Sequence, residues 1–366
     1  MLQMDLRREP FKTKDNNRPM CRAADIKNKP SQSGERICTV ERAASPRVNP
    51  TERQGTEVAH ALGIGAAAPA GPSLLSTWGE ELAQAMLEMD MLTEQEYAMD
   101  FFTYMMRKQS AHVFRPVDIP KSVTAEMRNV LVDWLIQVHE YLALEEETLY
   151  LAVYLLNFYL SERRIHTSKL QLLASTCLFI ACKIEESLIP EPAELCFMMG
   201  DAYGKKELLK MERKVLYRLR FDLSYTQPVH FLRLLSLTGK CPEKISFLAM
   251  YFMELTLREA DGMMIEPALL ACAALRLAQV VVTLSCGLQM SPAVPRLYSY
   301  SDAELLGSLQ LMARSALRSD ANSTWQKFSR PQRLEVSAEP ALSAKNLRRC
   351  IGSLSLQRQA ACPVTD

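Results

Sequence analysis

The residues with the clearest chemical potential lie at 178–187, in the stretch Leu-Phe-Ile-Ala-Cys-Lys-Ile-Glu-Glu-Ser. After five apolar positions this stretch ends with Lys183, Glu185 and Glu186. A lysine at the end of a buried helix must pair with a carboxylate or reach water, because an unpaired buried charge is costly. Glu212, in the later helical segment 205–219, is the candidate partner. The alternative interpretation is a solvated helix cap, with all of these charges turned out into water.

No other side chains in the sequence have the spacing of a catalytic or metal site. The chain contains no GxGxxG, GxxxxGK or GxSxG loop. Its five histidines are isolated and lack the spacing of zinc ligands. Its ten cysteines include no CxxC pair, which indicates reduced thiols in an intracellular protein rather than a disulfide framework. We therefore expect no catalytic residues, no cofactor and no metal, and we expect that the protein is not an enzyme.

Composition and charge argue against two further classes of partner. The 366 residues are 48% hydrophobic and carry a net charge of +1, whereas a nucleic-acid-binding domain usually has a large basic excess. The most apolar stretch, 267–288, contains Arg276 and Gln279, which favours a buried helix over a membrane span. The N-terminus has charges from Asp5 onward and no apolar run, so no secretory signal is expected. We expect an intracellular protein, in the nucleus, the cytoplasm or both, with no nucleic-acid or membrane partner.

The elements that must position Lys183 are helices. In 126–142 apolar residues recur at i, i+3, i+4 and i+7, and Val132 and Ile136 add a second apolar face, which predicts a surrounded helix. Strand signals are short and weak. The flanks differ in composition, because 1–54 holds twelve Lys and Arg against seven Asp and Glu and a low-complexity linker follows. We predict a disordered tail over 1–75 and a second tail over 331–366.

The sequence also resembles itself when it is shifted by 97 residues. Tyr-Leu-Ala-Val-Tyr-Leu-Leu-Asn-Phe-Tyr-Leu at 150–160 aligns without gaps with Phe-Leu-Ala-Met-Tyr-Phe-Met-Glu-Leu-Thr-Leu at 247–257. The segments 172–181 and 269–278 align at the same offset. We interpret the middle of the chain as two copies of one all-α unit, each of about five helices around a central helix.

The second copy serves as an internal control for the charged residues. At the same offset Lys183 aligns with Val280, and Glu212 aligns with Leu309. The folding unit therefore does not need charges at these positions. In the first copy they are additions, which favours a role in partner binding.

These segments resemble the cyclin family, in particular its A/B-type group. Met-Arg-Asn-Val-Leu-Val-Asp-Trp-Leu-Ile-Gln at 127–137 is similar to the opening of the cyclin box, and 169–186 and 211–232 continue it. Phe-Leu-Ala-Met-Tyr-Phe-Met-Glu-Leu at 247–255 resembles the C-terminal cyclin fold. The resemblance covers roughly 93–330. It implies an all-α fold of two tandem five-helix bundles with a preceding N-terminal helix: a cyclin box over 90–224, a C-terminal cyclin fold over 225–330, and disordered tails.

The resemblance implies a non-catalytic subunit that binds and activates a cyclin-dependent protein kinase. In the family, the residues matching Lys183 and Glu212 pair with each other and hydrogen-bond the kinase near its αC helix. Apolar residues pack around that helix, and two residues of the preceding N-terminal helix also face the kinase. The matching positions in this chain are Ile180, Ile184, Leu216, Phe221 and Leu223, with Tyr97 and Phe101 in the N-terminal helix.

A second implied surface binds Arg-x-Leu docking segments of substrates or inhibitors. Its matching residues are Met127, Val130, Leu131, Trp134, Gln137, Leu170 and Gln171. Spacing alone would favour a core stripe for the helical members of this set. Related cyclins place an acidic residue where this chain has Gln137, which predicts a weaker attraction for the docking arginine.

Two departures from the family pattern leave alternatives open. The family usually has Asp-Arg where this chain has Asn157-Phe158, so the arginine matching Arg128 loses its carboxylate partner. The N-terminal tail contains no Arg-x-x-Leu destruction box. A pseudo-cyclin scaffold that binds a partner without activating it is one alternative. A DNA-binding transcription factor of the same fold is the other, although the basic face and zinc ribbon typical of that class are missing.

Overall fold

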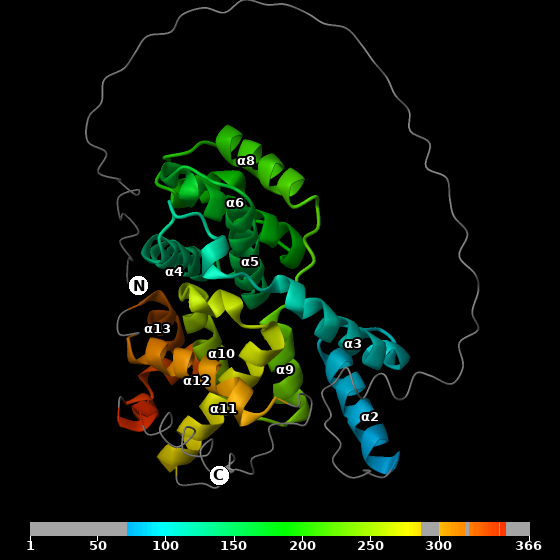
Figure 1. The fold of residues 1–366 in the computed structure, drawn as a ribbon. Helices are drawn as coiled ribbons and strands as arrows, with labels where there is room; N and C mark the ends of the chain where they lie inside the picture. Colours follow the sequence, from blue (N-terminus) through cyan, green and yellow to red (C-terminus); the bar gives the residue numbers. More distant parts are fainter. Residues whose placement is uncertain (1–71, 287–299, 319–321, 344, 349–366) are drawn as a thin grey trace, which may run out of the picture.

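The computed structural model describes residues 72–286, 300–318, 322–343 and 345–348, and these residues form helices and turns without any strand. The predicted tail over 1–75 falls almost entirely outside this range. The helices are α2 (Pro72–Glu88), α3 (Ala98–Lys108), α4 (Ala125–Tyr141), α5 (Glu146–Glu162), α6 (Leu170–Glu185), α7 (Pro192–Met198), α8 (Lys205–Arg218), α9 (Pro228–Thr238), α10 (Glu243–Arg258), α11 (Pro267–Cys286), α12 (Asp302–Leu317) and α13 (Ser323–Phe328). The all-α prediction is confirmed (Figure 1).

The internal repeat is visible in the positions where the helices begin. The helices α5, α6 and α8 begin at Glu146, Leu170 and Lys205, and α10, α11 and α12 each begin 97 residues later. In Figure 1 the first set, α4 to α8, forms one bundle and the second set, α9 to α12, forms another beside it. The two bundles predicted from sequence self-similarity are therefore present.

Each bundle is built around one enclosed helix. All residues of α5 from Glu146 to Asn157 are buried, and α10 occupies the equivalent place in the second bundle. The surrounded helix is thus α5, and the expectation that 126–142 is surrounded is wrong. One side of α4 remains open to solvent because Val130 and Tyr141 have no helix packed over them.

Local sequence explains where the helices begin. The Thr124 hydroxyl accepts a hydrogen bond from the Met127 amide at 3.1 Å and caps α4. Prolines at the first turns of α7 and α9, Pro192 and Pro228, occupy positions where a missing N–H costs nothing. Ser301 and Glu304 form a capping box at the start of α12. The starts of the helices are therefore set by their own residues.

The N-terminal helices belong to the second bundle rather than the first. Leu82 and Met86 of α2, with Phe102 and Met105 of α3, are buried in the same core as α9, α10 and α11. This differs from the predicted grouping of residues 90–108 with the first bundle. The described structure also begins at Pro72, inside the segment predicted as a tail. An amphipathic α3 needs an apolar surface, and the second bundle provides it.

The chain remains ordered beyond residue 330, so the predicted C-terminal tail begins too early. Three short 3-10 turns follow α13, and they cover Pro331–Arg333, Val336–Ala338 and Pro340–Leu342. Val336 is fully buried against the second core. Lys327 of α13 is 1% exposed and donates to Glu254 of α10 at 2.6 Å and to Glu146 of α5 at 2.8 Å. This C-terminal segment, residues 322–343, therefore ties both bundles together.

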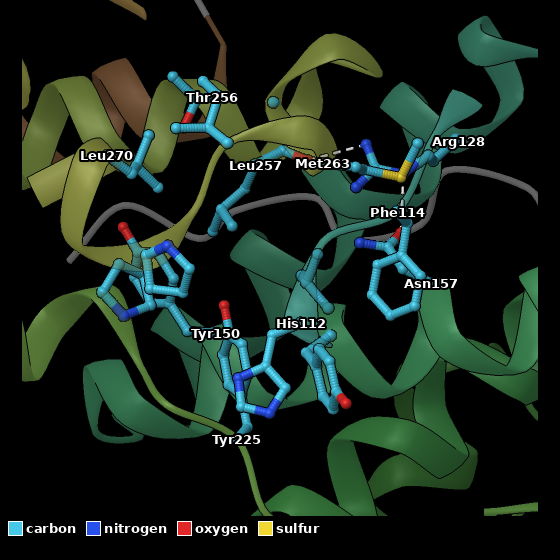
Figure 2. Close-up of a pocket in the computed structure, with 16 residues that line it drawn as sticks. His112, Phe114, Arg128, Tyr150, Asn157, Tyr225, Thr256, Leu257, Met263 and Leu270 are labelled. Carbon is cyan, nitrogen blue, oxygen red and sulfur yellow. Dashed lines mark hydrogen bonds between the residues drawn. The ribbon is translucent and has the colours of Figure 1, made fainter. Parts of the chain in front are cut away.

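The two bundles meet around Arg128 of α4, as Figure 2 shows. The Arg128 Nε donates to Asn157 Oδ1 at 3.0 Å, and its Nη1 donates to the Leu257 carbonyl at 2.9 Å. Further carbonyls at the C-terminal end of α10 lie within 3.5 Å. Burial lowers the pKa of Arg128 to about 10, and Glu259 opposes this shift. The negative end of the α10 dipole thus supplies compensation that Asn157 lacks.

A small cavity of about 40 Å³ lies at this junction. His112 is packed edge-on against Tyr154 and Tyr225, whose rings stack with centroids 4.3 Å apart. The His112 Nδ1 accepts a hydrogen bond from the Thr226 amide at 3.2 Å. Burial, with Lys108 nearby, lowers the pKa of His112 to about 4, and Asp222 opposes this. The imidazole is therefore neutral in the folded protein.

The neutral state of His112 predicts a pH dependence of stability. Because the folded-state pKa lies below the ordinary value, the unfolded chain binds the proton first, and stability is lost as pH falls from about 6.5 toward 4. Between pH 7 and pH 5 we expect wild type to lose about 1–2 kcal/mol more than His112→Gln. Urea unfolding of both proteins at the two pH values measures this difference. Equal losses would contradict the assignment.

Candidate functional site

The two charges singled out in the sequence form an ion pair between α6 and α8. The Lys183 Nζ lies 2.5 Å from Glu212 Oε1. The Lys183 side chain is 40% exposed and that of Glu212 is 10% exposed, so the pair lies at the surface with its acidic member below. The ammonium also lies 4.3 Å from the centre of the Phe179 ring, within cation–π range. Lys183 is thereby held in place with part of its head group open to a partner.

The two glutamates that follow Lys183 have structural roles. Glu186 accepts hydrogen bonds from the Glu145 amide at 2.8 Å and the Thr148 hydroxyl at 2.5 Å, both at the start of α5. Glu185 accepts a hydrogen bond from Gln227 Nε2 at 2.7 Å, and burial raises its pKa. These bonds fix the end of α6 against α5 and against the start of the second bundle. Lys183 is the one charge of this group that faces outward.

Several apolar side chains are exposed or half-buried on the two helices that carry the ion pair and just after α8. Ile184 is exposed on α6, and Leu216 and Leu223 are half-buried on or after α8. Phe221 is 62% exposed, with its ring centre 5.8 Å from that of Tyr217. We call Lys183, Glu212, Ile184, Leu216, Phe221 and Leu223 the Lys183 surface. A half-exposed cation together with exposed apolar residues is a suitable arrangement for binding another protein.

The backbone is strained where it presents Phe221. Arg220 and Phe221 both have positive φ values, 52° and 59°, directly after α8 ends. Non-glycine residues in this region cost free energy, and such residues concentrate at functional sites. The Phe221 amide still donates to the Leu216 carbonyl at 3.0 Å, which closes the helix end. The turn presents an aromatic ring to solvent at the end of α8, the helix that carries Glu212.

Ile180 does not lie on this surface, although the resemblance implied it. Its side chain is 2% exposed and packs in the core of the first bundle. Ile184 lies one helical turn later. Both residues belong to the same apolar run, so the sequence does not show which of the two is exposed. Tyr97 is exposed at the end of the 3-10 turn that precedes α3, and Phe101 is half-buried on α3, where its ring stacks on that of Tyr104. Because α3 lies far from α6 and α8 in Figure 1, these two residues form a separate part of the surface.

Sequence reasoning missed several exposed apolar residues near the end of α6. Leu188 and Ile189 follow α6 directly, and Phe197 lies on α7. The sequence signal for these residues is that Leu188 and Ile189 are aliphatic although they lie in a loop. Leu188 and Ile189 add exposed apolar residues close in sequence to Lys183.

The second implied surface lies on the open side of α4 and divides into exposed and buried members. Val130 is 49% exposed, whereas Leu131 is 1% exposed and belongs to the core. Leu170 is buried as well, which corrects its place in the patch. The half-buried members are Met127, Trp134, Gln137 and Gln171.

The polar residues beside this patch are already paired. Gln137 Nε2 donates to Asp133 Oδ2 at 3.0 Å. The same carboxylate accepts a hydrogen bond from the Ser323 hydroxyl at 2.9 Å. Glu140 forms an ion pair with Arg330 of the C-terminal segment. The acidic side of α4 therefore faces α13 rather than a ligand.

Two other kinds of feature are absent from the part of the chain that the structure describes. No group of three or more His, Cys, Asp or Glu there is placed to hold a metal ion. No helix in the described ranges is long and apolar enough to cross a membrane. The Lys183 surface is thus the strongest candidate site among the described residues.

Both halves of the chain match known protein domains. Residues 100–224 match the cyclin N-terminal domain, and residues 226–342 match the cyclin C-terminal domain. The G2/mitotic-specific cyclin-B2 of Oryzias javanicus is 31% identical over 289 residues, covering 74% of this chain and 75% of the relative. The G2/mitotic-specific cyclin-B of Hydra vulgaris is 34% identical over 254 residues, covering 68% of this chain and 69% of the relative.

Solved structures support the same fold. A viral cyclin from herpesvirus saimiri superposes with a TM-score of 0.53 at 19% identity, covering 61% of this chain and 99% of the viral chain. At that identity the likeness concerns the fold alone. The two matches divide between residues 224 and 226, before α9 begins the second bundle, and the C-terminal match includes the turns after residue 330. Because the cyclin N-terminal and C-terminal domains both match, the chain belongs to the cyclin family.

Proposed function

We propose that this chain is the regulatory subunit of a cyclin-dependent protein kinase, which it binds through the Lys183 surface and activates. The observation that supports this most is the Lys183–Glu212 pair, present in the first bundle and replaced by Val280 and Leu309 in the second. Members of the cyclin family are regulatory subunits rather than enzymes. The B-type names of the relatives support a role in the cell cycle.

The proposed mechanism is a population shift in the kinase. An active kinase needs the glutamate of its αC helix paired with the β3 lysine. A surface that binds only this αC-in form stabilises it, and about 5.5 kcal/mol of preference moves a state from about 1% to about 99%. Phe221, Ile184 and Leu216 would supply the apolar area, and Lys183 would donate hydrogen bonds to backbone carbonyls. Nothing in this mechanism requires a reacting group on the cyclin.

The test is co-purification of the full chain with kinases from dividing cells, followed by a histone-kinase assay. We expect a bound kinase whose activity depends on the added chain. A kinase that binds but stays inactive would support the pseudo-cyclin scaffold instead. Absence of any bound kinase, with the chain folded by circular dichroism, would contradict the proposal.

We further propose that the open side of α4 docks Arg-x-Leu segments of substrates or inhibitors. Val130 gives the sharpest test because it is exposed, whereas its neighbour Leu131 is in the core. We expect Val130→Asp to weaken binding of an Arg-x-Leu peptide at least about tenfold and to leave kinase binding unchanged, since distant sites act independently. Fluorescence anisotropy measures the peptide, and Leu131→Ala is the contrast, with reduced stability expected. Unchanged peptide affinity in a folded Val130→Asp protein would remove this proposal.

A further inference from the structure

The outer side of α8 carries a concentration of positive charge that the proposed kinase site does not use. The helix holds six lysines and arginines against two glutamates, in a chain whose net charge is only +1. Both glutamates are already paired, Glu207 with Lys169 and Glu212 with Lys183. The excess charge of α8 is therefore not neutralised within the helix.

Three of these cations lie on one face of α8. Lys206, Lys210 and Arg213 stand at i, i+4 and i+7, and Tyr217 follows at i+11, so the four residues form one line. The line extends about 16 Å along the helix. We call Lys206, Lys210, Arg213 and Tyr217 the α8 basic face. Figure 1 shows α8 at the outer edge of the first bundle, away from the second.

The cations of this face have no internal partners. All three are exposed, and none forms an ion pair with another residue of the described ranges. Other surface arginines of the same bundle do find carboxylates, such as Arg218 with Glu162 and Arg115 with Asp118. The three cations of the α8 basic face are therefore available to a partner.

The end of this face is apolar. Tyr217 is 73% exposed and meets the Phe221 ring edge-on. A row of lysines that served only to keep the helix surface solvated would not require an exposed aromatic pair at its end, so the pair favours a binding role. Arg213 follows Glu212 by one residue and so points about 100° around the helix from it. The basic face thus adjoins the Lys183 surface without being the same surface.

We propose that the α8 basic face docks a short acidic segment of a partner protein. Three cations in a row attract the carboxylates of consecutive Asp and Glu residues, and the Tyr217–Phe221 pair accepts an apolar side chain next to them. A protein segment fits better than a nucleic acid, because one helix face offers three aligned cations and the chain as a whole has no basic excess. The three cations lie outside the proposed kinase surface, and Phe221 belongs to both surfaces.

The test uses the full chain without a kinase and a labelled twelve-residue peptide of Asp and Glu with one Leu. Fluorescence anisotropy is expected to show saturable binding that weakens several-fold between 50 and 200 mM salt. The variant K206E/K210E/R213E should bind at least about tenfold more weakly. The matched control is K121E/K240E/R314E, which makes the same change in net charge at exposed positions elsewhere and should bind like wild type.

Three results would overturn the proposal. The first is an equal loss in the matched control, which would reduce the effect to net charge. The second is the absence of saturable peptide binding by a wild-type protein that is folded by circular dichroism. The third is tighter binding of a single-stranded RNA of equal charge, which would assign the face to nucleic acid. Tyr217→Ala, which leaves the charge unchanged, should weaken the Leu-containing peptide and not one with Leu replaced by Ser.

Discussion

A Lys183→Val protein is expected to fold normally and to lose its kinase. Valine is the residue that the second bundle uses at the equivalent position, Val280, so the helix tolerates it. Removing one member of a hydrogen-bonded charge pair that an interface desolvates costs about 2–5 kcal/mol of binding. This corresponds to an affinity about 30- to several-thousand-fold lower. Because Lys183 is 40% exposed in the free chain, its pair adds at most about 1 kcal/mol to folding.

The measurement is kinase co-purification and activity, with circular dichroism as the check on folding. Lys169→Val is the matched control, because Lys169, directly before α6, forms an exposed ion pair with Glu207 of α8 at 3.3 Å. The control should retain the kinase. If Lys183→Val folds and still activates a kinase at wild-type strength, Lys183 is only a helix cap.

The largest effect on stability is expected from Lys327→Met. Lys327 compensates two buried carboxylates, Glu146 and Glu254, which come from different bundles. Leaving them without the lysine should cost about 3–5 kcal/mol, or roughly 6–20 °C in Tm. Burial raises the pKa of Glu254 to about 7, with Lys327 opposing this shift. A protonated Glu254 needs no counter-charge, so the loss should be larger at pH 8 than at pH 6.

Thermal and urea unfolding at both pH values measure this loss. Lys244→Met is the control, because Lys244 forms a surface pair with Glu339 at 2.7 Å and should cost under about 1 kcal/mol. Adding Glu254→Gln to Lys327→Met should recover part of the stability, since Arg333 still compensates Glu146 at 2.5 Å. A Lys327→Met protein as stable as the control would show that the buried lysine is dispensable.

The sequence alone was sufficient to predict features that leave a short-range or repeating pattern. Helical periodicity predicted the all-α class, and the offset of 97 residues predicted the two bundles and identified Lys183 and Glu212 as additions. The resemblance also supplied the Arg128–Asn157 contact, which is present at 3.0 Å. The carbonyls at the end of α10 that compensate Arg128 are 129 to 131 residues away. A local sequence pattern could not predict that these carbonyls contact Arg128.

The errors of prediction have the same cause. Ile180 and Ile184 are equally apolar, and only the packing of α6 decides which one is buried. The segment after residue 330 is polar and irregular, so composition suggested a tail. Its place in the fold depends on Lys327, whose partner Glu146 lies 181 residues earlier. Contacts of this range follow from the assembled fold and not from any window of sequence.

The buried cations have a consequence for cooperativity. Asn157 of α5 and Glu254 of α10 occupy equivalent positions in the two repeats, and each binds a buried cation, Arg128 in one case and Lys327 in the other. Each cation also binds the opposite bundle, Arg128 through the Leu257 carbonyl and Lys327 through Glu146. If one bundle opened alone, a buried charge in the other bundle would lose its partner. We therefore expect the two halves to open together, so that opening of the second half also disrupts the Lys183 surface on the first.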